Sequence, residues 1–143
     1  MEPEGLLQDP GALGHERVTA EQAVRTYLAA LNSGDVDRIA ARVSEDFYNE
    51  HTSALGASLR GRDAYRERLP SFLAAFGGLH YEVEDLIVAG DRAAVAYRMT
   101  ATWHGETPVT IRGMFRFRVE GGLIAHRIDY WDSAEFERQV ALT

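Results

Sequence analysis

Apolar residues in the first half of the chain recur every three or four positions, which is typical of amphipathic helices. Thr19 and Gln22 have the spacing of a capping box, so a helix is expected to begin there and to end at Asn32-Ser33-Gly34. Asp35 is the expected N-cap of a second, shorter helix whose apolar stripe extends to residue 43. Residues 47–48 then suggest a short extended segment.

Small residues fill positions 52–61, which predicts a loop able to close over a ligand, and a third helix is expected from Arg62. Pro70 lies inside this helix and predicts a kink or a restart, because proline removes a backbone hydrogen bond. The helical period stops at Gly77-Gly78.

After residue 80 the period changes to two, which predicts strands over 81–89, 93–104, 109–119 and 123–131, and a terminal helix over 133–140. The third strand has an apolar face and a face that carries Arg112, Arg116 and Arg118. Helices followed by a run of antiparallel strands predict an α+β domain, a cone of N-terminal helices packed on a curved, mainly antiparallel sheet. Such a cone has an apolar interior suited to a small ligand.

The composition is that of a single globular domain: 143 residues, 45% hydrophobic and 26% charged. Residues 1–17 show no period and are expected to be a flexible arm before a domain over 18–143. The absence of cysteine excludes thiol chemistry, and a net charge of −7 argues against nucleic acid as a partner. No uncharged run is long enough for a membrane helix, so we expect a cytoplasmic protein without a membrane partner.

Four phrases carry a resemblance to a known family: YLAALNSGD at 27–35, GRDA at 61–64, GMFRF at 113–117 and DYWD at 129–132. With them, residues 18–140 resemble the nuclear transport factor 2-like superfamily. That superfamily includes ketosteroid isomerases, SnoaL-like polyketide cyclases, scytalone dehydratase and limonene epoxide hydrolase. Because its members range from enzymes to binding modules, the fold alone selects no reaction.

The resemblance to limonene epoxide hydrolase implies three catalytic residues: Tyr48 to position water, Arg98 as the central arginine, and Asp129 as the base. Glu50 stands where that family has asparagine, and Thr100 stands where it has the acidic aspartate. A threonine hydroxyl is a poor proton donor, so Glu50 is the first candidate for the acid. In this hypothesis Arg98 pairs with Asp129 inside the cone and holds its carboxylate in place.

The resemblance to ketosteroid isomerases implies that Tyr27 occupies the place of the oxyanion-hole tyrosine. His51 and Gly113 stand where that family has its base and its protonated aspartic acid. We expect the substrate to contact a wider set, namely Tyr27, His51, Thr100, Gly113, Phe115 and Trp131. By strand alternation, Tyr48 and Glu50 share one face of an extended segment, and His51 points to the other.

The sequence therefore favours a cofactor-independent enzyme that acts on a hydrophobic, cyclic small molecule by general acid/base catalysis, most like an epoxide hydrolase. A SnoaL-like cyclase or an isomerase, and a non-catalytic ligand-binding or dimerisation module, stay open as alternatives. The histidines are not spaced as metal ligands, so no metal is expected. If Arg98 points inward, Tyr97, Met99 and Trp103 point outward, which suggests a homodimer through the outer sheet face.

Overall fold

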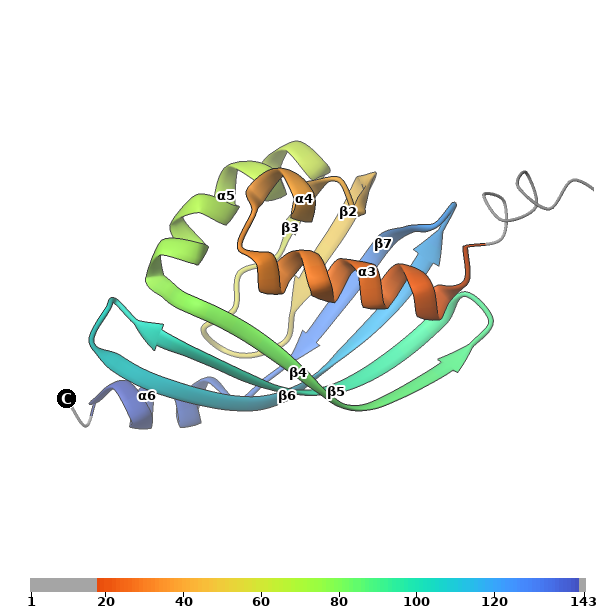
Figure 1. Cartoon of the computed structure of the whole chain (residues 1–143). Coiled ribbons are helices and arrows are strands. Elements are labelled where there is room, and N and C mark those ends of the chain that lie inside the picture. The colour runs from red at the N-terminus through yellow and green to blue at the C-terminus, as the bar shows by residue number, and fades with distance from the viewer. Residues whose placement is uncertain (1–17, 142–143) are drawn as a thin grey trace, which may run out of the picture.

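The computed structural model describes residues 18–141, in which helices pack on a curved six-stranded sheet (Figure 1). The predicted α+β class, with N-terminal helices on a curved and mainly antiparallel sheet, is confirmed. The expected arm over 1–17 lies outside the described residues.

Helix α3 (Ala20–Ser33) begins and ends where the sequence predicts. The Thr19 side chain accepts a hydrogen bond from the Gln22 backbone, and the Gln22 side chain accepts one from the Thr19 backbone, which completes the capping box. Gly34 ends the helix with a positive φ of 70°, a conformation that glycine adopts at little cost.

Helix α4 (Val36–Ala40) is shorter than predicted, because residue 43 already belongs to strand β2 (Val43–His51). Val43 pairs with Ile124 of strand β7 (Leu123–Tyr130), in a parallel arrangement. A β-branched residue that fits the helical stripe fits a buried strand equally well, and pairing with a distant strand decides between the two.

Helix α5 (Arg62–Ala75) passes through Pro70 as one helix, so the predicted restart does not occur. Pro70 lies on the exposed side of α5, where the backbone carbonyl that loses its partner can face water. Strand β4 (Phe76–Ala89) follows directly and begins earlier than the predicted residue 81.

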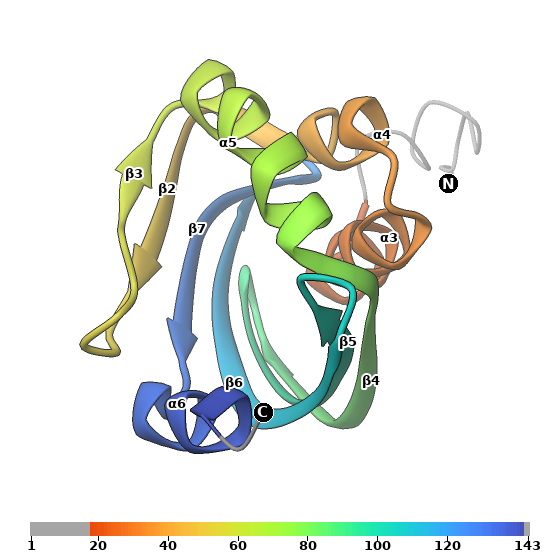
Figure 2. The ribbon, with the colours of Figure 1, turned by 90° about the vertical axis from the view of Figure 1, so that its left-hand side faces the viewer.

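The sheet has the order β3-β2-β7-β6-β5-β4, with β3 spanning Leu59–Arg60, β5 spanning Arg92–Trp103 and β6 spanning Thr107–Glu120. Neighbouring strands are antiparallel except for β2 and β7. The sheet curves around an interior that α3 and α5 cover, while helix α6 (Ser133–Ala141) packs on β6 (Figure 2). The largest fully buried side chains come from both layers: Tyr27, Leu31, Ile39, Phe47, Phe115, Phe117 and Ile124.

Within residues 18–141, none of the helices is both long and apolar enough to cross a bilayer.

Candidate functional site

A cavity of about 490 Å³ lies between α5 and the sheet. Strands β2 and β7 contribute an amide, an imidazole, a guanidinium and a carboxylate to its wall, α5 contributes Arg68, and most of the remaining wall is apolar. The wall consists of Asn49, His51, Leu55, Gly56, Ala57, Tyr65, Arg68, Leu69, Phe72, Phe76, Tyr81, Tyr97, Met99, Trp103, Ile111, Arg127, Asp129, Trp131 and Phe136. This volume is within the range of pockets that take drug-sized ligands.

Aromatic side chains form a continuous apolar wall. Phe76 lies 5.1 Å from Phe72 and 5.0 Å from Trp103, measured between ring centroids. Phe136 of α6 joins Trp103 at 5.0 Å and Trp131 at 6.3 Å. Flat apolar ligands pack well on such surfaces, so this wall favours a ring-shaped substrate.

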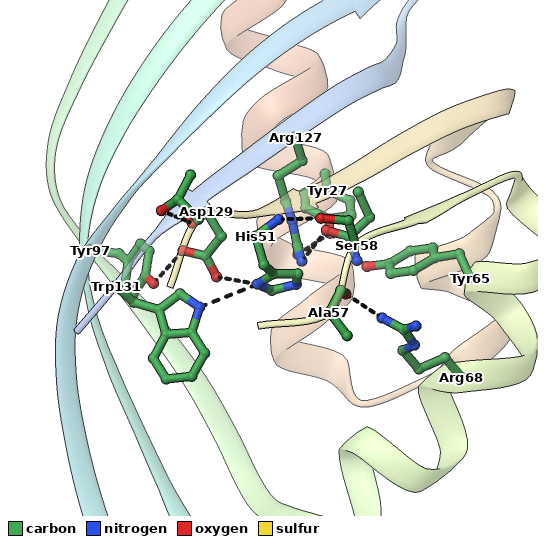
Figure 3. A network of polar contacts seen from close by, with 12 residues as sticks. Tyr27, His51, Ala57, Ser58, Tyr65, Arg68, Tyr97, Arg127, Asp129 and Trp131 are labelled. Atoms are coloured by element: carbon green, nitrogen blue, oxygen red, sulfur yellow. Dashed lines mark hydrogen bonds and ion pairs between the residues drawn. The ribbon is translucent and has the colours of Figure 1, made fainter. Parts of the chain in front are cut away.

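Asp129 of β7 is the carboxylate of the cavity and is only 5% exposed. Its Oδ1 accepts a hydrogen bond of 2.6 Å from the Tyr97 hydroxyl (Figure 3). Burial raises the pKa of Asp129 to about 6, although Arg127 and the hydrogen bond from Tyr97 act in the opposite direction. A carboxylate with such a pKa is ionised at neutral pH and is a stronger base than an exposed aspartate.

Arg127 is a buried cation beside this carboxylate and is 6% exposed. Its two terminal nitrogens donate to the Tyr27 hydroxyl at 2.7 Å and to Asn49 Oδ1 at 2.8 Å, both neutral acceptors. The guanidinium lies over the Phe115 ring at 4.9 Å, and its Nε has no partner among the described residues. No carboxylate of residues 18–141 forms an ion pair with Arg127, so its positive charge acts on the cavity.

His51 of β2 lies between Asp129 and the segment that follows β2 (Figure 3). Its Nδ1 accepts a hydrogen bond of 3.2 Å from the Trp131 indole and is 3.8 Å from Asp129 Oδ2. Burial, together with the charges of Arg127 and Arg68, lowers the pKa of His51 to about 3. His51 is therefore a neutral imidazole at neutral pH.

The segment between His51 and Leu59 covers one side of the cavity, through Leu55, Gly56 and Ala57. The Ala57 carbonyl accepts a hydrogen bond of 2.6 Å from Arg68 of α5, and Ser58 Oγ accepts one from the His51 backbone. These contacts place the predicted loop against the ligand space.

The family model of the SnoaL-like domain matches residues 24–127, which is more than half of the chain. The chain belongs to the SnoaL-like domain family. A search of curated proteins found no match.

Solved structures share the fold of this chain. A protein of ketosteroid isomerase-like fold from Catenulispora acidiphila, in complex with trimethylamine, is 20% identical, with a TM-score of 0.77 over 85% of this chain and 94% of the other. A putative SnoaL-like polyketide cyclase from Shewanella denitrificans is 13% identical, with a TM-score of 0.78 over 87% and 98%. TerC, co-crystallised with polyporic acid, is 20% identical, with a TM-score of 0.75 over 85% and 98%. At these identities the likeness concerns the fold.

Three of the residues expected from the sequence line the cavity of this SnoaL-like domain: Asp129, His51 and Trp131. Tyr27 and Phe115 lie behind the wall, fully buried, and each contacts the Arg127 side chain. They support the cation and are not part of the cavity wall.

The predicted pairing of Arg98 with Asp129 is wrong. Arg98 and Thr100 share the outer face of β5. The Arg98 side chain is 48% exposed, and its guanidinium lies 3.4 Å from the Glu82 carboxylate. Tyr97, with its neighbours of the same parity, points inward and is buried, so the expected outward patch of Tyr97, Met99 and Trp103 does not form. The sequence of β5 favours this orientation, because its large apolar side chains share the face of Tyr97 and its arginines and threonines share the face of Arg98. The resemblance to limonene epoxide hydrolase pointed to the wrong face.

Tyr48 and Glu50 also point away from the cavity. The Tyr48 ring stacks on His126 at 5.0 Å, and Glu50 Oε1 lies 3.0 Å from His126 Nε2, both on the outer side of the sheet. The predicted alternation along β2 is thus confirmed, since His51 points the other way. The expected set of Tyr48, Glu50, Arg98 and Asp129 does not converge.

Arg127, Asn49 and Tyr97 line the cavity but were not expected there from the sequence. A signal for Arg127 and Asn49 is present, because they stand two residues before Asp129 and His51 and thus share their strand faces. Among residues 18–141, no three histidine or acidic side chains are close enough to hold a metal ion.

Gly113 is the residue that lets Tyr97 reach Asp129. A Cβ at this position would lie 2.5 Å from the Tyr97 hydroxyl and 2.7 Å from the Tyr130 carbonyl. We expect Gly113→Ala to push the ring away and to lower the free energy of unfolding by about 1–3 kcal/mol, as overpacking does. Urea denaturation measures this, with Arg116→Ala, at an exposed position of the same strand, as the control. Equal unfolding midpoints for the two variants would contradict the prediction.

Proposed function

We propose that this SnoaL-like domain is a cofactor-independent enzyme of the cyclase or isomerase type. It removes a proton from the carbon next to a carbonyl in a flat, largely apolar small molecule. The observation that carries the proposal is Asp129, a buried carboxylate with a pKa raised to about 6, on the wall of an apolar cavity beside the cation of Arg127. The cyclase and isomerase relatives of the family support this class of reaction.

The first step is the removal of the proton by Asp129. Tyr97 occupies Oδ1, so Oδ2 is the oxygen available to the substrate. The C–H bond breaks, its proton moves to Oδ2, and its electron pair forms the enolate, with the negative charge on the former carbonyl oxygen. The charge of Asp129 passes to the substrate, so the cavity keeps the same net charge beside Arg127.

The enolate then has two outcomes. The proton returns to another carbon, which gives an isomer, or the enolate carbon attacks a second carbonyl of the substrate and closes a ring. In the second case the C–O π bond of that carbonyl breaks, and the resulting alkoxide takes the proton back from Asp129. Both outcomes use the same base and the same cation. The side chains of the cavity supply both groups, so neither step requires a cofactor.

Exchange of hydrogen for deuterium tests the first step without knowledge of the natural substrate. We expect the protein in D₂O to accelerate deuterium incorporation at the α-carbons of 1-tetralone or 2-tetralone, followed by NMR. Arg98→Gln is the matched control, because it removes an arginine from the outer face and should leave the rate unchanged. Binding of the ketones without any acceleration would contradict the proposal and favour a non-catalytic ligand-binding module.

The positions of Arg98 and Tyr48 argue against the hypothesis of epoxide hydrolysis. The arginine and the tyrosine on which that hypothesis depended lie on the outer side of the sheet, away from Asp129. We therefore favour proton abstraction over attack of water on an epoxide.

A homodimer through the outer sheet face is kept as part of the proposal, on different residues from those first expected. Met114 and Tyr130 are opposite each other on β6 and β7 and are 42% and 39% exposed. These two adjacent side chains give the outer face an apolar contact point, and we place the two-fold interface there. Sedimentation should show a dimer that Met114→Glu dissociates. A single 15.9 kDa species for the unmodified chain would contradict it.

A further inference from the structure

Trp131 makes a directed contact with His51 that the steps above do not use. The indole nitrogen of Trp131 lies 3.2 Å from His51 Nδ1 (Figure 3). An indole N–H can only donate, so Nδ1 must carry a lone pair and the imidazole proton must be on Nε2. His51 Nε2 has no hydrogen-bond partner among residues 18–141, and the side chain lines the cavity.

A second group competes for the same nitrogen. Asp129 Oδ2 is 3.8 Å from His51 Nδ1, too far for a hydrogen bond but near enough for one after a small rotation. In the opposite tautomer, Nδ1–H would donate to Oδ2. Both oxygens of Asp129 would then accept hydrogen bonds, because Oδ1 already accepts one from Tyr97. A carboxylate held in this way is a weaker base.

We propose that Trp131 is a positioning residue that holds His51 as its Nε2–H tautomer. His51 then donates a hydrogen bond to the substrate oxygen, and Oδ2 of Asp129 stays free to take the proton. The role given to Asp129 rests on the proposed function. The tautomer itself does not, since it follows from the contact between Trp131 and His51.

The surroundings of His51 agree with a neutral donor. Arg127 and Asp129 face it from β7, Arg68 from α5, and the backbone of Gly56 packs against its Cβ. Burial, with the charges of the two arginines, lowers the pKa of His51 to about 3, so the ring carries one proton over the whole neutral range. That single proton resides on one of two nitrogens, and Trp131 selects which one.

The test is Trp131→Phe, which keeps an aromatic ring but removes the N–H group. Long-range ¹H–¹⁵N NMR of the imidazole, without substrate, should show the Nε2–H form in the unmodified protein and a shift toward Nδ1–H in the variant. The pKa of Asp129, followed by carboxyl ¹³C NMR, should fall by about one unit because it gains a hydrogen bond. Deuterium exchange into the tetralones should slow about tenfold.

Trp103→Phe is the matched control. Trp103 lines the same cavity and contacts Phe76 and Phe136, but its indole N–H makes no hydrogen bond among the described residues. We expect this variant to keep the His51 tautomer and the pKa of Asp129, even if it changes the KM.

Two results would overturn the proposal: an Nδ1–H tautomer in the unmodified protein, or an unchanged tautomer and Asp129 pKa in Trp131→Phe. The first needs no variant, so it decides the question even if Trp131→Phe does not fold. If the unmodified protein shows the Nε2–H form but never exchanges α-protons, the proposed function fails and the positioning by Trp131 still stands.

Discussion

Asp129→Asn is expected to slow the exchange of α-protons in the tetralones by about 10²–10⁴-fold, the contribution of a general base. The asparagine can still accept the hydrogen bond from Tyr97, so the shape of the cavity is kept. Binding of the ketones, followed by tryptophan fluorescence, should therefore change little. Turnover close to that of the unmodified protein would remove Asp129 from the mechanism.

The same variant is expected to gain stability at neutral pH. The pKa of Asp129 is about 6 in the folded protein, above the value of 3.8 for an unperturbed aspartate, so the folded state binds this proton more tightly than the unfolded state does. The stabilisation from the protonated form is complete below pH 3.8 and is lost as the pH rises through 6. Above pH 6, Asp129→Asn should be more stable than the unmodified protein by about 3 kcal/mol, and this difference should shrink toward pH 4.

The pKa of His51 is shifted in the opposite direction. Its pKa falls to about 3 in the folded protein, so the stabilisation from the neutral form is complete above pH 6.5 and is lost as the pH falls toward 3. His51→Gln should thus gain stability relative to the unmodified protein on the acid side. Urea denaturation at pH 4, 5, 6 and 7 separates the two variants, and parallel stability curves for both would contradict the assigned pKa directions.

Arg127→Met is expected to cause the second large loss, about 10²–10³-fold in exchange rate, because the developing enolate loses its cation. Arg127→Lys is the control that keeps the charge. Since the charge of Arg127 lowers the pKa of Asp129, its removal should move the pH midpoint of the residual activity above 6. A midpoint that stays in place would show that the two groups do not interact.

The stability of Arg127→Met distinguishes an electrostatic effect from a packing defect. An ionised Asp129 without its neighbouring cation is costly, so Arg127→Met should lose stability as the pH rises, and the further change Asp129→Asn should restore it. A loss that does not depend on pH, and that the second change does not restore, would indicate damaged packing.

The local features of the fold could be predicted because their causes lie within a few residues. The Thr19 capping box fixes the start of α3, and strict alternation over 109–119 fixes both β6 and its buried face. The predicted element boundaries that are wrong depend on the tertiary structure. Residue 43 belongs to a strand because it pairs with the distant Ile124. The helix continues through Pro70 because that side of α5 is exposed to solvent.

The sequence by itself determined the class of fold, the family, and Asp129 as the carboxylate of the site. It also determined that His51 points away from Tyr48 and Glu50, since alternation within one strand is a local property. The alternation in β5 also indicates its buried face, since the large apolar side chains share the parity of Tyr97 and the arginines and threonines share that of Arg98. Only the tertiary structure decided that Arg127 of β7 is the cation beside Asp129 in the cavity wall. A buried charge goes against the local pattern and depends on hydrogen-bond partners from distant segments, here Tyr27 and Asn49 for Arg127 and Tyr97 for Asp129.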